Sequence, residues 1–239
     1  MEIVNNQNMG HGNNIINKIA EDILNNHVEK LSLYDLRFQD YIQSLKMQEK
    51  IHAFVQKENI SGVVLTMNYP NLYTIGKSGN KSDILVSQDD LDRKGIQIYE
   101  SNRGGEITYH GPGQLIYYPI INLKKLRIKP VEYIRIIQKT IMDSLYDFNI
   151  KSDHDNKPVG VWVNGKKISS IGVRISKSVS MHGVSVNLNC DLKYFTYIIP
   201  CGIKDLSLTN ICSETTLKCE KDDFDKSFIK NLNNHIFNL

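Results

Sequence analysis

The sequence has no apolar run of the roughly 18 residues that a membrane-spanning helix needs, which excludes such a helix on length grounds. Residues 1–30 contain no arginine and no apolar signal core, and they carry several acidic side chains. This composition argues against both a secretory signal and an organellar transit peptide. We therefore expect a soluble, cytoplasmic protein.

Cysteines at CxxC spacing are also missing, because the four cysteines are Cys190, Cys201, Cys212 and Cys219. Neither a zinc ribbon nor a thioredoxin-type redox site is predicted. Free cysteines in a reducing compartment are mostly small buried apolar side chains, and this is our interpretation of Cys190, Cys212 and Cys219.

A strong charge of one sign is absent as well. The chain has 29 basic and 26 acidic side chains, so its net charge of +3 does not indicate a nucleic-acid binder. This small positive charge is compatible with a modest attraction to acidic protein partners. Neither a Walker A nor a GxGxxG pattern occurs, so no nucleotide phosphate site is predicted.

The chain of 239 residues is long enough for one good core, and no Pro-, Gly- or Ser-rich stretch divides it into halves. The first 26 residues are rich in asparagine and poor in apolar groups. We therefore expect a loose extension over residues 1–26 and a single domain over residues 27–239.

Apolar residues recur at helical spacing in Tyr41–Val55, in a segment opened by Pro130, and in Phe224–Leu239. The second of these helices should bury a face made by Ile134, Ile137, Ile141, Leu145 and Phe148. These helices should pack against the strands of a sheet.

Short apolar runs predict strands at Val63–Leu65, Leu115–Leu123 and Met181–Leu188. Pro119 has no N–H to donate, so the second strand should lie at a sheet edge or bulge there. Asn164-Gly165 within Val161–Ile175 predicts a hairpin with a two-residue type I′ turn. Helices scattered among such strands favour an α/β or α+β fold, a mixed β-sheet flanked by helices, over a doubly wound one.

Arg103–Gln114 packs four glycines, a proline, an arginine and a histidine into a stretch directly before a strand. Glycines allow the backbone to approach a ligand closely, and consecutive N–H groups can polarise a carbonyl or hold an anion. A tight structural loop stabilised by Arg103 is the alternative interpretation.

Two adjacent lysines, Lys166 and Lys167, follow the predicted turn, and strand alternation must send their side chains to opposite faces. One can face a site while the other is a solvated charge. The two-residue turn pairs Trp162 with Lys167 and Val163 with Lys166. Further along the chain, Cys201 lies between Pro200 and Gly202, so a turn presents it instead of a packed element.

These segments together resemble the lipoyl(octanoyl) transferase family, whose RGGxxTxHGPGQ, GVW...KI..IG, HG and PCG signatures occur here in order. The resemblance covers roughly residues 30 to 215, and the Arg103–Gln114 block is its most specific part. One departure is Asn68, where members of the family often have a histidine.

The resemblance implies the mixed-sheet fold shared with biotin and lipoate protein ligases. It implies transfer of an octanoyl group from octanoyl-acyl carrier protein to a lysine of lipoyl domains, those of 2-oxoacid dehydrogenase E2 subunits and of the glycine cleavage H protein, as the first step of protein lipoylation. No metal or nucleotide cofactor is expected.

By the same resemblance, Cys201 would carry the acyl thioester, and Lys167 would favour its thiolate form and handle protons. The acyl substrate would be bound by residues of three segments, namely Arg103, Gly104, Gly105, Glu106, Ile107, Thr108, Tyr109, His110, Ser170, Ile171, Gly172, Gly183, Val184 and Ser185.

Three alternatives stay open at this point. An ATP-dependent lipoate or biotin protein ligase of the same fold would need an adenylate site but no nucleophilic cysteine. A non-catalytic acyl-carrier-binding protein would form no adduct. A zinc hydrolase built from His110, His182 and Cys201 is the weakest of the three, because these ligands have no recognised spacing.

Overall fold

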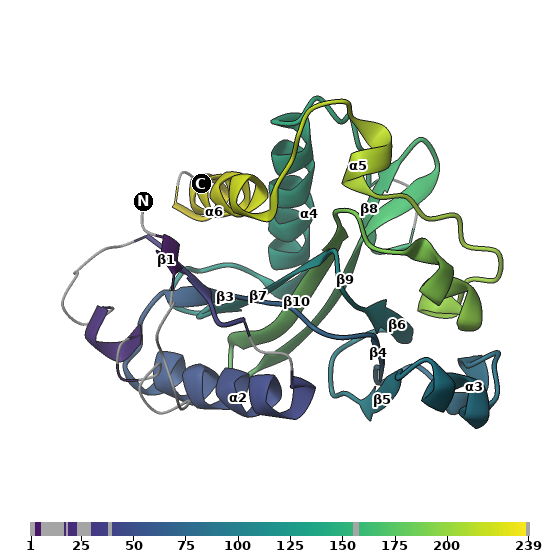
Figure 1. Cartoon of the computed structure of the whole chain (residues 1–239). Coiled ribbons are helices and arrows are strands. Elements are labelled where there is room, and N and C mark those ends of the chain that lie inside the picture. Colours follow the sequence, from purple (N-terminus) through teal and green to yellow (C-terminus); the bar gives the residue numbers. More distant parts are fainter. Residues whose placement is uncertain are drawn as a thin grey trace.

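The structure, a computed structural model, describes residues 3–5, 17, 19–22, 30–37, 40–154 and 158–237. A seven-stranded sheet dominates it, in the order β1-β2-β3-β7-β10-β9-β8 (Figure 1). The strands are β1 Ile3–Asn5, β2 Leu33–Asp35, β3 Gly62–Met67, β7 Gln114–Ile121, β8 Gly160–Val163, β9 Lys166–Ser176 and β10 Val179–Asn187. β1, β2 and β3 run parallel, whereas every other pairing in this sheet is antiparallel.

A smaller sheet of three strands, β4 Leu72–Ile75, β5 Gln97–Glu100 and β6 Ile107–His110, lies beside it in the order β5-β4-β6. It too combines a parallel and an antiparallel pairing. The predicted mixed-sheet fold is confirmed.

Helix α2, Tyr41–Lys57, covers one face of the large sheet, and α4, Pro130–Tyr146, with α6, Lys221–Phe237, covers the other (Figure 1). The short elements are α3 Gln88–Arg93, α5 Ile211–Glu214 and the 3₁₀ turns η1 Lys81–Asp83, η2 Leu192–Tyr197 and η3 Pro200–Gly202. Asp40 caps α2 by accepting a hydrogen bond from the backbone N–H of Gln43, and Pro130 opens α4 in the first turn, where a missing N–H costs nothing. All three long helices confirm their sequence predictions, although Leu239 lies outside the described residues.

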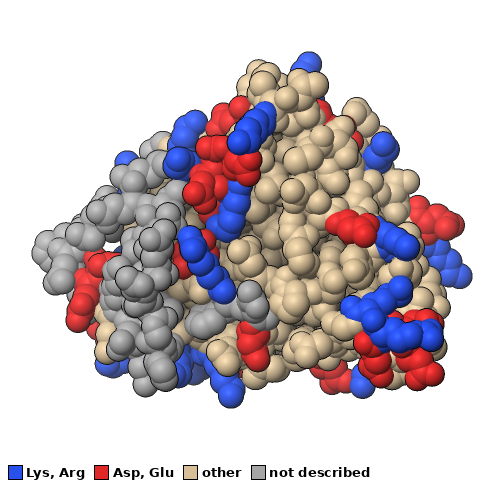
Figure 2. Space-filling view, in the orientation of Figure 1, with Lys and Arg blue, Asp and Glu red and all other residues tan. Residues whose placement is uncertain are grey.

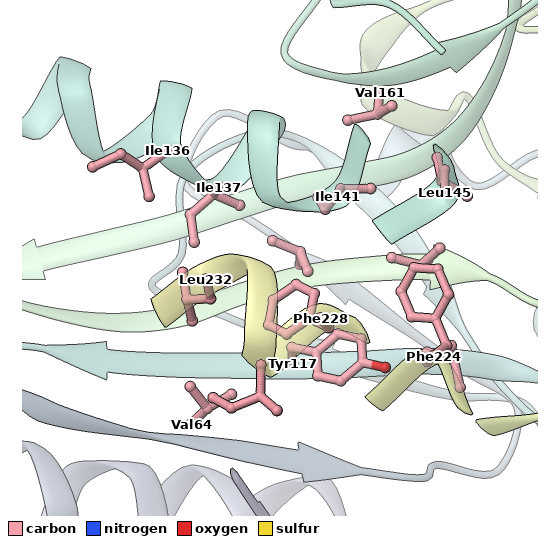
Figure 3. Close-up of a cluster of buried hydrophobic side chains, with 14 of the residues drawn as sticks. Val64, Tyr117, Ile136, Ile137, Ile141, Leu145, Val161, Phe224, Phe228 and Leu232 are labelled. Carbon is pink, nitrogen blue, oxygen red and sulfur yellow. The ribbon is translucent and has the colours of Figure 1, made fainter. Parts of the chain in front are cut away.

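Each face of the large sheet has its own apolar core. Under α4 and α6, Ile137, Ile141 and Phe228 pack around Tyr117 of β7 (Figure 3), whose ring stacks on that of Phe228 at 4.0 Å between centroids. A second core lies under α2, and a third joins the small sheet to η2. In the space-filling view, charged side chains gather around the periphery of one face and leave its centre largely uncharged (Figure 2).

The predicted β8–β9 hairpin is present. Asn164 and Gly165 form its turn with φ of 49° and 79°, as a type I′ turn requires. Trp162 pairs with Lys167 and Val163 with Lys166, which confirms the predicted register. Lys166 is exposed and Lys167 is buried, so the lysines do take opposite faces.

The prediction that Pro119 lies at a sheet edge is wrong, because β7 is a central strand between β3 and β10. The alternative, a local irregularity, fits better: pairing with β10 ends at Tyr117 opposite Val184. Beyond that point the Ser180 hydroxyl donates to Pro119 O at 2.7 Å and accepts from Ile121 N at 2.9 Å. A serine side chain thus replaces the ladder that proline interrupts.

Much of the predicted extension over residues 1–26 lies outside the described residues. Where it is described, Ile3–Asn5 pairs with β2 and Ile19 is buried in the core under α2. Backbone pairing needs no apolar side chains, so a polar composition does not prevent it. In the described part of the chain, no helix combines the length and the apolar character needed to cross a membrane.

Candidate active site

A cavity of about 420 Å³ opens where β9 and β10 of the large sheet meet β6, η3 and the loop before β6. Its size falls within the range of about 300–1,000 Å³ that is typical of small-molecule sites. The described lining residues are Tyr41, Thr74, Arg103, Gly104, Gly105, Glu106, Ile107, Thr108, His110, Tyr118, Ile134, Pro158, Val159, Lys167, Ser170, Ile171, Gly172, Val173, His182, Gly183, Val184, Ser185 and Cys201.

Lys167 and Cys201 meet in this cavity. Lys167 is 1% exposed, and its Nζ donates a hydrogen bond to Cys201 Sγ at 3.2 Å. The ammonium also lies 5.6 Å from the centroid of the Trp162 ring, and no described carboxylate forms an ion pair with it. Gly160 makes room for this side chain, since a Cβ there would lie 2.4 Å from Lys167 Cε. A buried cation next to a thiol stabilises the thiolate.

The turn η3 presents the cysteine in a left-handed backbone conformation, with φ of 57° and ψ of 26° at Cys201. Non-glycine residues adopt this conformation at a cost, which the surrounding structure must offset. The turn closes through Ile203 N donating to Pro200 O at 3.1 Å. The chain then returns to β9, where Lys167 N donates to Ser207 O at 2.8 Å and Thr209 N donates to Lys167 O at 3.1 Å.

Arg103 forms one wall of the cavity and is buried. Its guanidinium donates to Thr74 O at 2.6 Å, to Thr74 Oγ1 at 2.9 and 3.1 Å and to Gly104 O at 3.0 Å. Burial lowers the pKa of Arg103, an effect opposed by the negative charges that Tyr41, Cys201, Tyr118 and Glu106 carry when they are ionised. An arginine nevertheless remains charged at any physiological pH.

Two neutral histidines complete the polar lining. Burial lowers the pKa of His110 to about 4, and burial, helped by the positive charge of Arg103, lowers that of His182 to about 3. His182 Nε2 lies 2.7 Å from Asn102 Oδ1, and the residue has a positive φ of 55°. Among the described residues no group of three His, Cys, Asp or Glu side chains is placed to hold a metal ion.

A chain of amides fixes the tautomer of His110. Asn187 Nδ2 donates to Thr209 O at 3.0 Å, and Gln114 Nε2 donates to Asn187 Oδ1 at 3.0 Å. Gln114 Oε1 is then the acceptor that His110 Nδ1 contacts at 2.8 Å. The proton of His110 therefore sits on Nδ1, and Nε2 keeps its lone pair.

Of the site residues named from the sequence, all but Tyr109 line the cavity. The side chain of Tyr109 lies in the third core, stacked on Tyr194 with centroids 5.1 Å apart, and its hydroxyl donates to Asn71 Oδ1 at 2.8 Å. Ile107, Thr108 and His110 of the same strand all line the cavity, so it is the packing of the Tyr109 ring in the third core that keeps it out.

Sequence reasoning missed the lining residues Tyr41, Thr74, Tyr118, Ile134, Pro158, Val159, Val173 and His182. His182 lies within a segment already singled out, next to Gly183, and could have been found. Ile134 was expected in a buried helix face, but it lies at the cavity instead. Val173 directly follows Gly172 in β9 and could also have been found. The others come from separate elements, and only the tertiary fold brings them together.

The interpretation of the remaining cysteines is right for Cys190 and Cys219, which are buried, and wrong for Cys212, which is exposed. Cys212 lies in α5, a single helical turn at the surface whose inward-facing residue is Ile211. One turn buries one side chain and leaves its neighbour in solvent.

Comparison of the sequence with known proteins shows the family of this chain. The sequence profile of the lipoyl protein ligase A/B catalytic domain matches residues 40–233, so the chain belongs to this family. Its relatives include an octanoyltransferase of Solibacter usitatus, 39% identical over 69% of this chain and 74% of that protein. An octanoyltransferase of Flavobacterium johnsoniae is 34% identical over 87% of this chain and 97% of that protein.

A crystal structure of lipoate-protein ligase A bound with ATP has a similar fold, with a TM-score of 0.69 and 13% identity over 86% of this chain and 85% of that chain. The likeness concerns the fold alone. It confirms the ligase-type architecture that the resemblance implied.

Proposed function

We propose that this chain is an octanoyltransferase that carries the acyl group on Cys201 and delivers it to a lysine of a lipoyl domain, the first step of protein lipoylation. One observation carries the proposal: Lys167 Nζ lies 3.2 Å from Cys201 Sγ at a cavity large enough for an acyl chain. The names of the relatives and the order of the sequence motifs support it.

In the first half-reaction the Cys201 thiolate attacks the carbonyl carbon of the octanoyl thioester on acyl carrier protein. A new carbon–sulfur bond forms, and the bond to the carrier's sulfur breaks. The carrier leaves as a thiolate and takes a proton from the Lys167 ammonium. The enzyme is left with a thioester at Cys201 and a neutral amine at Lys167.

In the second half-reaction Lys167 removes a proton from the ammonium of the acceptor lysine, whose amine then attacks the Cys201 thioester. The amide bond forms, the carbon–sulfur bond breaks, and the nitrogen gives up its second proton to solvent. Cys201 leaves as a thiolate beside the Lys167 ammonium. The starting ion pair is restored, and no metal or nucleotide takes part in either step.

The donor in this proposal is octanoyl-acyl carrier protein, and the acceptors are lipoyl domains of 2-oxoacid dehydrogenase E2 subunits and the glycine cleavage H protein. The cytoplasm is the proposed location. Neither nucleic acid nor a membrane is a partner in this proposal.

An ATP-dependent ligase would have no use for a thiol hydrogen-bonded to a buried ammonium, and a non-catalytic binding protein would need neither group. Incubation with ATP and free octanoate distinguishes the ligase, because only that enzyme would modify a lipoyl domain from the free acid.

The direct test is mass spectrometry of the protein after mixing with octanoyl-acyl carrier protein, before any acceptor is added. We expect one octanoyl adduct, which Cys201→Ser abolishes and the exposed-cysteine control Cys212→Ser retains. Burial raises the pKa of Cys190 and of Cys219 to about 12, so both stay protonated and unreactive. Full adduct formation by Cys201→Ser would contradict the thioester mechanism.

A further inference from the structure

Glu106 is the only carboxylate among the described residues that line the cavity. It lies against the nucleophile's turn: a Cβ on Gly202 would be 3.4 Å from Glu106 Cγ and 3.8 Å from Oε1. Its backbone is held in place, since Gly76 N donates to Glu106 O at 3.1 Å and Ser78 N donates to Gly105 O at 3.2 Å. The side chain is half-buried, and no described residue forms a hydrogen bond or ion pair with the carboxylate.

The charges around the cavity change when Cys201 is acylated. His110 and His182 are neutral, and burial raises the pKa of Tyr41 and of Tyr118, so these tyrosines are neutral too. Acylation removes the negative charge of the thiolate, while Arg103 remains cationic. A lysine arriving from the acceptor brings another positive charge, because its amine is protonated at neutral pH. Among the described lining residues only Glu106 can offset these charges.

The protons released in the second half-reaction also require an anion at the cavity. The nitrogen of the acceptor lysine must lose two protons to pass from ammonium to amide. Neutral Lys167 takes the first and thereby regains the charge that it shares with the Cys201 thiolate. The second proton needs another acceptor with a route to solvent, and the half-buried carboxylate beside the Cys201 turn offers both.

We propose that Glu106 binds the ammonium of the acceptor lysine at the cavity and takes its second proton as the amide forms, releasing that proton to water. This role rests on the proposed octanoyl transfer and adds to it a residue that selects a cationic nucleophile. It concerns the second half-reaction alone, because the octanoyl thioester that reacts in the first is uncharged.

The test uses Glu106→Gln, which keeps the shape of the side chain and removes its charge. Octanoyl-enzyme is first formed from octanoyl-acyl carrier protein and then mixed with either a lipoyl domain or hydroxylamine, a nucleophile that is neutral at neutral pH. We expect transfer to the lipoyl domain to slow on the order of 10- to 100-fold, in line with the loss of a general base. Release by hydroxylamine should keep the rate of the unmodified protein.

Asp205→Asn is the matched control. Asp205 is an exposed carboxylate four residues after Cys201 that does not line the cavity, and asparagine tolerates its φ of 57°. We expect both transfer rates to stay unchanged in this variant. Glu106→Asp, which keeps the charge, should recover part of the transfer that Glu106→Gln loses.

Equal slowing of both nucleophiles in Glu106→Gln would overturn the role, since it would mean damage to the thioester site itself. Unchanged transfer to the lipoyl domain would overturn it as well. If the unmodified protein forms no octanoyl-enzyme at all, the proposed function is wrong, and the role proposed for Glu106 is wrong as well. This result differs from the other two, in which octanoyl-enzyme does form.

Discussion

Lys221 and Lys167, two lysines in the described part of the chain, have ammonium groups in sharply different surroundings. On the α6 side of the large sheet, Lys221 Nζ contacts Asp225 at 2.5 Å and Asp35 at 3.2 Å. Asp225 also accepts a hydrogen bond from the Tyr117 hydroxyl at 2.6 Å. In the cavity, Lys167 has the thiol of Cys201 as its hydrogen-bond partner and no described carboxylate in ion-pair contact.

The difference decides what each lysine can do. Burial alone would lower the pKa of Lys221, but the charges and hydrogen bonds of Asp225 and Asp35 outweigh it and raise that pKa. Lys221 is therefore held in its charged form and ties α6 to β2. Lys167 has a thiol as its hydrogen-bond partner and no such pair of carboxylates around it among the described residues. This arrangement is the one that the proposed proton transfers need.

The largest expected effect is on the cavity side. Lys167→Ala should slow octanoyl transfer by about 100-fold or more, because it removes both the charge next to the thiolate and the base of the second step. Alkylation of Cys201 by iodoacetamide, followed against pH, should move to higher pH in the same variant.

Lys166→Ala is the control for this prediction, because Lys166 lies next in the chain and points to solvent. It should change stability by no more than about 0.5 kcal/mol and leave the alkylation profile in place. If the alkylation profile shifts equally in both variants, or does not shift in Lys167→Ala, the placement of the two lysines on opposite faces of β9 has no chemical consequence.

The next effect tests the other ammonium. Asp225→Asn leaves Lys221 with a single carboxylate inside the protein, and breaking a buried ion pair in this way costs about 3 kcal/mol. Urea unfolding should show this loss. The transfer rate per folded molecule should stay the same; a fall in activity larger than the fall in folded protein would mean that the two lysines are coupled.

A third effect appears only in acid and concerns His182 in the cavity. The pKa of His182 is about 3 in the folded protein and about 6.5 when unfolded, so the unfolded chain binds the proton first as the pH falls. The stability that neutral His182 provides is complete above pH ~6.5 and declines below it by about 1.4 kcal/mol per pH unit.

His182→Asn removes this titration and tolerates the positive φ of the site. The free energy of unfolding should therefore depend less steeply on pH between about 4 and 6 in the variant than in the unmodified protein. Parallel pH dependences in urea titrations of the two proteins would refute the assignment of a neutral, buried His182.

Much of the fold could be predicted because it follows from local patterns. The 3.6-residue spacing of α2, α4 and α6 and the Asn164-Gly165 turn depend on residues close together in the chain, and the structure has all of them. The position of Pro119 could not be predicted, because its effect depends on Ser180, which is remote in sequence and supplies the missing hydrogen bonds. Strand order in a sheet is a long-range property that no local pattern encodes.

The site divides in the same way. The motif segments contain nearly all of the residues with which the loop before β6 and strands β9 and β10 line the cavity. Alternation along β9 correctly separates Lys167 from Lys166. Alternation along β6 would not have removed Tyr109 correctly, because Ile107 on the same side of that strand does line the cavity. Tyr41 and Tyr118 carry no local signal, since each reads as an ordinary core residue of its own element. The distance between Lys167 and Cys201 likewise depends on a long-range contact, the β-bridge that joins Leu208 to Lys167 of β9.

That last contact has a consequence for the newly made chain. The hydrogen bonds between residues 207–209 and Lys167 join segments that are made at different times, with β10 and two 3₁₀ turns between them. Until the later segment docks on β9, the lysine and the cysteine are not in contact. In the proposed mechanism the sulfur therefore becomes an activated nucleophile only in the completed fold, and a nascent or damaged copy does not expose one to the thioesters of the cell.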